Sequence, residues 1–416
     1  MKIGIVGLGY VGLPLAVAFA EAGHEVKGLD LDPAKVEALN AGRSYIEDVP
    51  DSVLAPLGER LRASADYADL APCEALIVCV PTPLTSSREP DLTYLLEAAE
   101  SIAGILRVGQ LVVLESTTYP GTTRERLTPI LEREAGLTVG SDFFVAFSPE
   151  RIDPGRTDYT IKTTPKLVGG MTAACTERAR ELYDLVCDEV VVVSTPEAAE
   201  LSKLLENVFR SVNIAFVNEL AQLCDRLGID VWEVIDAAAT KPFGFMRFDP
   251  GPGMGGHCLP VDPFYLAFRA REQNFYPEFI ELAGKVNQAQ PAFCVERIER
   301  ILNQAAKPVK GSKILVLGAS YKAGSGDTRE SPALVILRLL AALEADISYH
   351  DPFVPELPEL GLASVDLDRA LASTDLATIV TAHPGIDYAD VVATAARTLD
   401  FRGVTRGIES EKLERL

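Results

Sequence analysis

A glycine motif at the start of the chain determines how the first segment folds. In the run GLGYVG, Gly7, Gly9 and Gly12 stand between an apolar strand pattern and a helical pattern. The first glycine permits a tight turn, the second lets the backbone approach a pyrophosphate, and the third lets helix and strand pack closely. Asp30 ends the next strand pattern, where an acid would hold ribose hydroxyls and repel a 2′-phosphate. The motif therefore predicts a dinucleotide-binding βαβ unit that prefers NAD to NADP.

Other polar residues follow strand patterns on the side where such sheets bind their ligands. The runs CVPTP and ESTT each end a strand, and Lys35 lies five residues beyond Asp30. Lys35 is either a solvated helix cation or a contact to the pyrophosphate or ribose edge. The predicted cofactor-binding residues are Gly7, Gly9, Tyr10, Val11, Gly12, Asp30, Lys35, Pro81, Thr82, Ser116 and Thr117.

The alternation of short apolar strands with amphipathic helices is typical of a parallel α/β sheet. From Pro196 the pattern changes to long helical stretches, which favour a connector and subunit interface. A strand pattern returns at Lys313. We therefore predict an α/β fold with an N-terminal Rossmann-type domain (1–195), a central long-helix dimerisation domain (196–306) and a C-terminal Rossmann-like domain (307–416). The expected strands are Lys2–Val6, Glu25–Leu29, Ala75–Val80, Leu111–Glu115, Phe143–Phe147, Lys166–Gly169, Val190–Val193, Lys313–Leu317 and Asp346–His350, and the long helical stretches are Glu197–Leu227 and Pro277–Gln304.

Composition limits the classes of partner. The formal net charge of −21 argues against nucleic-acid binding, and no apolar run approaches the ~18 residues that a membrane span needs. The chain begins directly as a strand, without the pattern of a signal peptide, so we expect a cytoplasmic protein. Seven cysteines without metal-ligand spacing fit a reducing compartment and predict no metal site. Six are expected to be small buried hydrophobes: Cys73, Cys79, Cys175, Cys187, Cys224 and Cys294.

The seventh thiol stands in a different context. Cys258 lies in the run GPGMGGHCLPVDP, directly after a glycine-dense turn and four residues before Asp262. Three glycines ahead of a core residue would be costly to order. A thiol paired with a nicotinamide cofactor can take an alcohol through an aldehyde to an acid, holding the carbon covalently between two hydride transfers. This pattern predicts a nucleophilic cysteine.

Several runs together resemble the UDP-glucose/GDP-mannose dehydrogenase superfamily across essentially the whole chain. They are GLGYVGLPLA, VPTP, ESTTYPGTT, FSPERIDPG, ELSKLLENVFRSVNIAFVNE, GPGMGGHCLPVDP and SYKAGSGDTRESPA. SYIEDVP, SPERIDPG and HCLPVDP are similar to the UDP-N-acetylglucosamine 6-dehydrogenase branch. UDP-glucose dehydrogenases usually carry Lys where this chain has Val261, which disfavours UDP-glucose. The UDP-N-acetylmannosamine branch and a GalNAc epimer stay open.

The resemblance implies an NAD-dependent, four-electron oxidation of the C6 alcohol of a UDP-sugar, in polysaccharide biosynthesis. It implies that Cys258 forms the thiohemiacetal and thioester, that Lys203 and Asn207 stabilise oxyanions, and that Asp262 with Thr117 activates water. Glu150 would act in the proton transfers or in hydrolysis, and His257 would contact substrate rather than act as a base. It also implies a homodimer with an active-site arginine possible from the neighbouring subunit. The predicted substrate-binding residues are Glu150, Arg151, Lys203, Asn207, Arg247, Gly255, His257, Lys322 and Arg329.

Two other classes of function compete with this interpretation. A two-electron hydroxyacid dehydrogenase of the 6-phosphogluconate type would explain the glycine motif and Lys203, but it gives Cys258 no role and leaves the C-terminal lobe unexplained. A nucleotide-sugar-binding scaffold without chemistry would not need the six predicted catalytic residues together.

Overall fold

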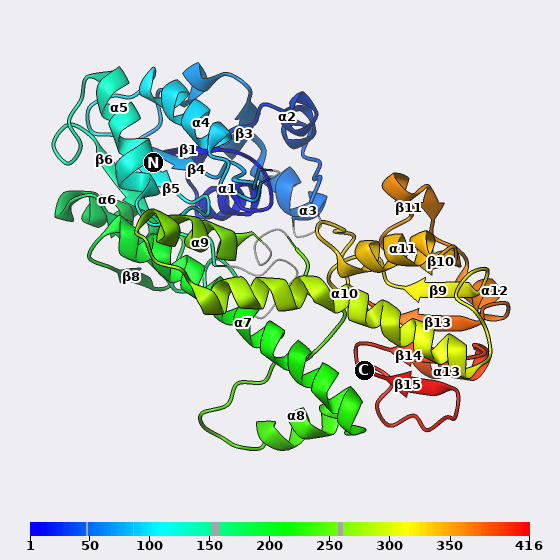
Figure 1. Cartoon of the computed structure of the whole chain (residues 1–416). Coiled ribbons are helices and arrows are strands. Elements are labelled where there is room, and N and C mark those ends of the chain that lie inside the picture. The colour runs from blue at the N-terminus through cyan, green and yellow to red at the C-terminus, as the bar shows by residue number, and fades with distance from the viewer. Residues whose placement is uncertain (47–48, 86, 152–158, 257–260) are drawn as a thin grey trace. The chain divides into compact units, whose positions relative to one another are not determined.

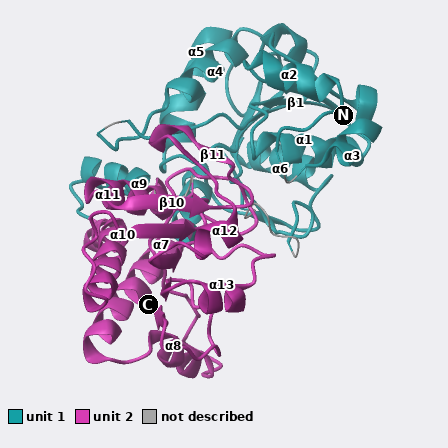
Figure 2. Ribbon diagram, turned by 90° about the vertical axis from the view of Figure 1, so that its right-hand side faces the viewer, with its two compact units in different colours: residues 1–206, 264–276 teal, residues 207–263, 277–416 magenta. Residues whose placement is uncertain are grey.

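The computed structural model describes residues 1–46, 49–85, 87–151, 159–256 and 261–416 (Figure 1). The chain divides into two compact units, coloured separately in Figure 2. Unit 1 comprises residues 1–206 and 264–276, and unit 2 comprises residues 207–263 and 277–416. The long helix α7 (Pro196–Leu227) contributes residues to both units.

Unit 1 is built on one mixed sheet with the strand order β3-β2-β1-β4-β5-β6-β7-β8. Every neighbouring pair is parallel except β6 and β7, which are antiparallel and whose connection has no helix among its described residues. Parallel neighbours need a crossover, usually a helix. The elements of this unit are β1 (Lys2–Val6), α1 (Gly12–Glu21), β2 (Glu25–Leu29), α2 (Pro33–Asn40), α3 (Asp51–Leu54), β3 (Leu61–Ser64), β4 (Ala75–Val78), α4 (Thr93–Ala103), β5 (Leu111–Leu114), α5 (Thr128–Ala135), β6 (Phe144–Phe147), β7 (Lys166–Gly170), α6 (Ala173–Tyr183), β8 (Val190–Val192), the first part of α7, and most of α9 (Asp262–Glu272).

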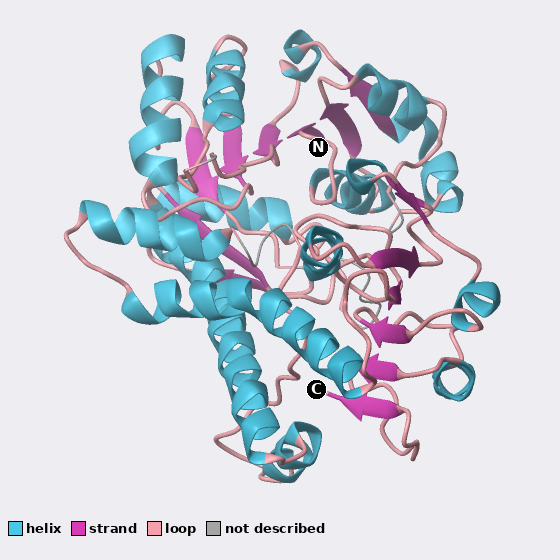
Figure 3. Cartoon of the chain, turned by 45° about the vertical axis from the view of Figure 1, so that its right-hand side comes forward, coloured by secondary structure: helices cyan, strands magenta, loops and turns pink. Residues whose placement is uncertain are grey.

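The central strands of this sheet are buried on both faces because their sequences are continuously apolar. β4 reads ALIV and β5 reads LVVL, and every one of these residues is buried. Alternate side chains of these strands pack into two hydrophobic cores, one on each face of the sheet. Ile77 and Val113 pack with α1 and α6, and Leu76 and Leu114 pack with α4 and α5. The helices covering the two faces are visible in Figure 3.

Unit 2 has a second sheet, with the order β10-β9-β13-β14-β15 and every pair parallel. Ile314 and Val316 face a core shared with α10 and α11, and Leu315 and Leu317 face α12 and α13. The elements are the rest of α7, α8 (Val231–Ala239), α10 (Glu278–Gln304), β9 (Lys313–Leu317), α11 (Pro332–Ala342), β10 (Asp346–His350), β11 (Glu356–Leu357), β12 (Leu362–Ala363), α12 (Leu367–Leu371), β13 (Leu376–Ile379), α13 (Tyr388–Thr394), β14 (Thr398–Asp400) and β15 (Leu413–Arg415).

The predicted α/β class, the two Rossmann-type sheets and both long helices are confirmed. The short edge strand β3 carries the sequence LRAS, which has no apolar run, and was not predicted. Among the described residues, no helix is both long and apolar enough to span a bilayer.

Candidate active site in two parts

The glycine motif forms the strand–turn–helix that the sequence predicts, and each glycine meets a different environment. Gly7 has φ +92°, and a Cβ there would lie 2.6 Å from the carbonyl oxygen of Cys79. A Cβ on Gly12 would collide with the carbonyl oxygen of Gly7. A Cβ on Gly9 would meet no described atom within 4 Å. Only the middle glycine therefore leaves open space beside the backbone, where the pyrophosphate of a dinucleotide would approach.

Asp30 ends β2 beside this turn, and its carboxylate is already partly engaged. It accepts hydrogen bonds from the backbone N–H of Leu8 and Asp32, both at 3.0 Å, and from Lys35 Nζ at 3.1 Å. A carboxylate offers about four acceptor sites, so capacity for a hydroxyl donor is left. Lys35 is thus held by Asp30, while Tyr45 anchors the turn by donating to the carbonyl of Leu8 at 2.8 Å. Tyr10 is exposed, and Val11 caps the start of α1.

Two strand-end loops of unit 1 are tied together by their own hydroxyls. Thr82 donates to the carbonyl of Thr117 at 2.7 Å, and Ser116 donates to the carbonyl of Val80 at 2.7 Å. Both donors are buried, whereas Pro81 is exposed and Thr117 is half-buried. These two hydroxyls fix the loop backbones by donating to them, and each can still accept a hydrogen bond. The predicted cofactor contacts of Pro81, Thr82, Ser116 and Thr117 stay predictions.

Glu200, on α7, clamps the loop that follows Thr117. Its buried carboxylate accepts hydrogen bonds from Gly121 N at 2.6 Å, Thr123 N at 2.8 Å and Thr123 Oγ1 at 2.7 Å. Burial raises the pKa of Glu200 to about 7, against these hydrogen bonds, which lower it. The clamp sets the position of the loop relative to Lys203, three residues further along the same helix.

Lys203 is a buried cation that has no partner among the described residues. The residue is only 8% exposed, and its ammonium makes no hydrogen bond or ion pair with any residue that the structure describes. An ammonium without a protein partner, carried by a largely buried side chain, is available to a ligand. The position suits a donor held ready for negative charge that develops on a ligand.

Glu150 and Arg151 follow the end of β6. Arg151 Nη2 forms an ion pair with Glu206 at 2.7 Å, and its Nη1 donates to the carbonyl of Pro165 at 2.7 Å. Arg151 N–H also donates to Glu150 Oε1 at 2.7 Å. The guanidinium therefore acts within unit 1 as a brace, and its predicted contact to substrate stays a prediction.

A buried charge cluster lies at the end of β5, directly before Ser116. Glu115 pairs with Lys166 at 2.9 Å and accepts a hydrogen bond from Tyr183, and all three are almost fully buried. Burial raises the pKa of Glu115, and Lys166 opposes that rise. For Lys166 itself, desolvation lowers the pKa, whereas the charges of Glu115 and Glu150 outweigh that effect and raise it. The cluster therefore also places the positive charge of Lys166 near Glu150.

Unit 2 brings together the predicted acid and amide. Asn207 Nδ2 donates to Asp262 Oδ2, and the residues are 9% and 2% exposed. Asp262 is the first residue of α9, where the helix dipole favours a negative charge. This carboxylate is thus held in one orientation by Asn207, as a group that orders water requires.

The glycine turn before Cys258 packs tightly within unit 2. A Cβ on Gly255 would lie 2.6 Å from Tyr321 Cβ, and Gly256 (φ +93°) lies against the ring of Tyr321. The N–H of Gly256 donates to the carbonyl of Arg329 at 3.1 Å. The turn therefore sits against the segment that carries Lys322 and Arg329, two of the predicted substrate-binding residues.

A buried amide network anchors the start of the same turn. Gly251 N–H donates to Asn218 Oδ1 at 3.0 Å, and Gln290 Nε2 donates to the Gly251 carbonyl at 3.0 Å. Asn218 Nδ2 in turn donates to Asn287 Oδ1 at 3.2 Å. These amides come from α7 and α10, so the two long helices fix where the turn begins.

Cys258 and His257 lie outside the described residues. The other six cysteines are buried free thiols, as predicted. Burial raises the pKa of Cys73 and Cys187 to about 11 and that of Cys79, Cys224 and Cys294 above the ordinary thiol value. These five are therefore poor thiolate nucleophiles at neutral pH.

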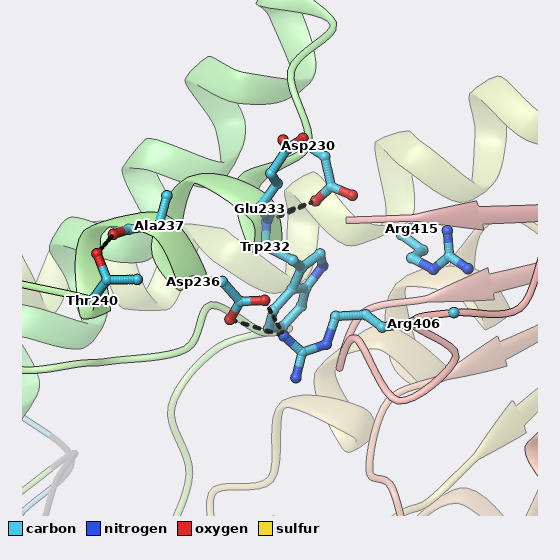
Figure 4. Close-up of a pocket in the computed structure, with 9 residues that line it drawn as sticks. Asp230, Trp232, Glu233, Asp236, Ala237, Thr240, Arg406 and Arg415 are labelled. Carbon is cyan, nitrogen blue, oxygen red and sulfur yellow. Dashed lines mark hydrogen bonds and ion pairs between the residues drawn. The ribbon is translucent and has the colours of Figure 1, made fainter.

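Arg247 and Arg329 pair with neighbouring acids. Arg247 contacts Asp236 at 2.6 Å and Asp249 at 2.9 Å, and Arg329 contacts Asp327 at 2.6 Å. Asp236 belongs to a pocket of about 450 Å³ in unit 2, where Arg406 pairs with it beside the indole of Trp232 (Figure 4). Its described lining includes none of the predicted site residues: Asp230, Trp232, Glu233, Asp236, Ala237, Thr240, Arg406, Gly407 and Arg415.

The motif patterns missed the residues that hold the site in place. Glu200, the Glu115–Lys166–Tyr183 cluster and the amides of α7 and α10 are polar residues inside helical or apolar patterns. Their burial was the only distinguishing signal, and it depends on tertiary packing.

A dinucleotide-type sheet, a second parallel sheet and a long helix with residues in both units define a protein of the nucleotide-binding Rossmann class. The chain belongs to the UDP-glucose/GDP-mannose dehydrogenase family: the NAD binding domain matches residues 1–187, the central domain residues 197–289 and the UDP binding domain residues 315–407. It is accordingly an NAD-dependent oxidoreductase that acts on nucleotide sugars.

Known relatives extend over nearly the whole chain. It is 37% identical to the UDP-N-acetyl-D-glucosamine 6-dehydrogenase of Pseudomonas aeruginosa, over 85% of this chain and 83% of that protein. It is 35% identical to an NDP-N-acetyl-D-galactosaminuronic acid dehydrogenase of Ralstonia solanacearum, over 97% and 96%. Among solved structures, a UDP-D-ManNAc dehydrogenase from Pyrococcus horikoshii superimposes with a TM-score of 0.92 at 32% identity, covering 100% of this chain and 99% of that one.

Proposed function

We propose that this protein oxidises the C6 alcohol of UDP-N-acetylglucosamine to the uronate, using two NAD⁺ and one water, through covalent intermediates on Cys258. The observation that carries the proposal is the largely buried side chain of Lys203, whose ammonium has no partner among the described residues and which lies one helical turn from Asn207 on α7. A dehydrogenase that captures an aldehyde on sulfur needs fixed donors for the oxyanion, and these two side chains can supply them.

The residues of this chain suit each step of that reaction. NAD⁺, when bound, accepts a hydride in each of two oxidations. The Cys258 thiolate adds to the aldehyde carbon, and Lys203 and Asn207 donate to the resulting oxyanion. Loss of the second hydride leaves a thioester. Water held by Asp262 and Thr117 then attacks the carbonyl, the C–S bond breaks, and the uronate leaves with the oxygen of that water.

The fit to NAD rests on unit 1. Gly9 leaves the backbone open to a pyrophosphate, the start of α1 supplies the positive end of a helix dipole, and Asp30 retains acceptor capacity for ribose hydroxyls. Lys35 would lie beside the ribose through its ion pair with Asp30. The nucleotide sugar is assigned to Lys322, Arg329 and the glycine turn of unit 2, with Glu150, Arg151 and His257 as further contacts.

We also infer a homodimer in which the exposed face of α7 forms the subunit interface. Phe209, Phe216, Leu223 and Leu227 are between 45% and 63% exposed, and their spacing places them on one helix face. Arg247 is the arginine we assign to the partner's active site, because it is exposed and its carboxylate partners are also exposed. A cytoplasmic location fits the six buried free thiols.

The test is the stoichiometry of NADH with a panel of purified UDP-sugars and GDP-mannose as control. Two NADH per UDP-N-acetylglucosamine, with slower turnover of UDP-glucose, is the expected result. Faster turnover of UDP-glucose or UDP-N-acetylmannosamine would overturn the choice of sugar. A Cys258→Ser variant should still bind UDP and form no uronate, and unchanged uronate production would refute the role of the thiol.

A two-electron hydroxyacid dehydrogenase predicts one NADH per substrate and no need for UDP. Solved structures of that kind share the fold alone with this chain: a 3-hydroxyisobutyrate dehydrogenase from Mycobacterium tuberculosis superimposes with a TM-score of 0.52 at 17% identity, over 70% of this chain. The match of residues 315–407 to a UDP binding domain favours the nucleotide-sugar reaction.

A further inference from the structure

The second sheet repeats the ligand-binding end of the first. Gly318 follows β9 with φ +89°, as Gly7 follows β1 with φ +92°. Asp351 follows β10, as Asp30 follows β2. In each unit the acid accepts a hydrogen bond from the residue after the glycine, at 3.0 Å from Leu8 N in unit 1 and at 2.7 Å from Ala319 N in unit 2.

The two acids differ in what else surrounds them. The side chain of Asp30 is 11% exposed, whereas that of Asp351 is fully buried. Asp351 also accepts from Ser320 N at 3.1 Å, from two further backbone N–H groups and from His383 Nε2 at 2.8 Å. Its acceptor sites are filled by the protein itself, so this acid cannot hold a ribose as Asp30 does. Its function is to hold the loop after β9.

The hydrogen bonds of His383 to Asp351 and to Gly324 indicate which tautomer its ring adopts. Burial raises the pKa of Asp351, but the hydrogen bonds from His383 and the backbone outweigh burial and lower it. The carboxylate is therefore an acceptor, and Nε2 of His383 carries the proton between them. The other ring nitrogen, Nδ1, lies 3.2 Å from Gly324 N, which is a donor. Nδ1 must therefore be an acceptor, and the imidazole is neutral.

The loop held in this way carries Lys322. Ser320 is fixed by Asp351 and by Thr381 Oγ1, which donates to the Ser320 carbonyl at 2.6 Å. Ser320 Oγ donates to the carbonyl of Lys322 at 2.8 Å. Gly324, two residues beyond Lys322, is fixed by His383. Lys322 thus lies between two points that are both tied to the same buried pair.

We propose that His383 is a positioning residue for substrate: as a neutral acceptor for the Gly324 N–H, it holds the Ser320–Gly324 loop so that Lys322 meets the diphosphate of the UDP-sugar. This inference rests on the proposed function. A buried polar pair contributes little to stability compared with an apolar one, so a role in orienting the loop accounts for its presence.

Two substitutions of His383 distinguish the hydrogen bond made by Nε2 from the one made by Nδ1. In His383→Gln the amide N–H can replace Nε2–H toward Asp351, but no acceptor faces Gly324. In His383→Asn the amide oxygen can replace Nδ1 and accept from Gly324. We expect His383→Gln to weaken UDP binding, measured by calorimetry, about five- to tenfold, the worth of roughly one hydrogen bond. His383→Asn should retain most of the affinity, and NADH binding should not change in either variant.

A double-mutant cycle with Lys322→Ala tests whether His383 acts through Lys322. Once Lys322 is absent, His383→Gln should cause less than about a twofold further loss. Equal loss in the two His383 variants, or a fully additive loss in the cycle, would show that His383 only packs the core. Unchanged UDP binding in His383→Gln would overturn the inference and leave the proposed function intact. Failure of the wild-type protein to bind UDP would overturn both.

A second variant covers the case in which the His383 variants do not fold. Thr381→Val removes the donor to the Ser320 carbonyl and leaves His383 and Asp351 in place, so it should also weaken UDP binding severalfold. Thr378→Val is the matched control on the neighbouring strand β13, because the buried hydroxyl of Thr378 has no hydrogen-bond partner among the described residues. Equal UDP affinity in the Thr381 and Thr378 variants would contradict the proposal.

Discussion

At the scale of single residues, we expect a substitution of Lys203 to lower activity without lowering stability. Lys203 is only 8% exposed and its ammonium has no partner in the part of the chain that the structure describes, so replacing it by methionine breaks no ion pair or hydrogen bond there. We expect Lys203→Met to keep or raise the melting temperature while kcat falls about 100-fold or more, the usual effect of losing an oxyanion donor. The measurements are NADH release with UDP-N-acetylglucosamine and thermal unfolding.

The matched control is another buried lysine of unit 1. Lys166 pairs with Glu115 at 2.9 Å, so Lys166→Met leaves a buried carboxylate without its partner. This variant should lose about 3–5 kcal/mol of stability. If Lys203→Met destabilised the protein as much as Lys166→Met, Lys203 would be a structural cation and the proposed role would be wrong.

The residues to which we assign the chemistry stand out in the sequence, whereas the residues that support them do not. Cys258 and Gly9 stand in runs whose residue types are unusual for packing, and this marks them without a structure. His383 and Asp351 stand in ordinary strand and turn patterns, and only the fold brings them to 2.8 Å. A side chain that acts through a contact distant in sequence leaves no local signal.

At the scale of elements, two glycines in the strand–turn–helix of unit 1 should respond differently to substitution by alanine: one substitution should lower stability, and the other should weaken NAD binding. Gly12→Ala should destabilise the fold, because its methyl would collide with the Gly7 carbonyl. Gly9→Ala should leave the melting temperature close to that of the wild type, because no described atom lies within 4 Å of the new methyl. Its KM for NAD should rise about tenfold or more, since the methyl occupies the space of the pyrophosphate. Unchanged KM in Gly9→Ala would contradict the predicted cofactor site.

The clamp between Glu200 and the loop at Gly121–Thr123 makes stability depend on pH. The pKa of Glu200 is about 7 in the folded state and 4.5 ordinarily. At pH values between these two, the folded state therefore retains a proton that the unfolded state releases. This contribution is complete below the ordinary pKa of 4.5 and is lost as pH rises through about 7. Between about pH 5 and 8 the free energy of unfolding should fall by about 2–3 kcal/mol from this group.

Glu200→Gln should abolish that slope, as measured by urea unfolding at both pH values. Glu197→Gln is the control on the same helix, because Glu197 is half-buried, pairs with Arg124 and has a lowered pKa. A wild-type slope in Glu200→Gln would show that another group titrates in this window.

Element types followed from period and composition, but the β6–β7 orientation did not. Long helices such as α7 were predicted within one residue because their patterns are uninterrupted. A parallel neighbour needs a crossover connection and an antiparallel one does not, but the apolar run of β7 is the same for either direction.

At the scale of the whole molecule, the exposed stripe on α7 predicts the assembly. Phe209, Phe216, Leu223 and Leu227 recur along about 27 Å of helix. A continuous apolar face of this length on a solvent-exposed helix is typical of an interface. Phe216 is 63% exposed, so Phe216→Glu should leave the fold of each subunit intact and place a charge in the dimer contact.

We therefore expect Phe216→Glu to sediment as a monomer where the wild type sediments as a dimer, with the melting temperature of the subunit otherwise retained. Val108→Glu is the control, because Val108 is 71% exposed on a loop of unit 1, away from α7 in sequence. This variant should remain dimeric.

If Arg247 enters the partner's site, the monomeric Phe216→Glu protein should bind NADH normally but lose most of its turnover. Mixing it with an excess of Cys258→Ser subunits should restore none of that turnover, since the carboxylate introduced on α7 blocks mixed dimers as well. A dimeric Phe216→Glu protein would place the interface on another surface, and an active monomer would remove the need for an arginine from the partner.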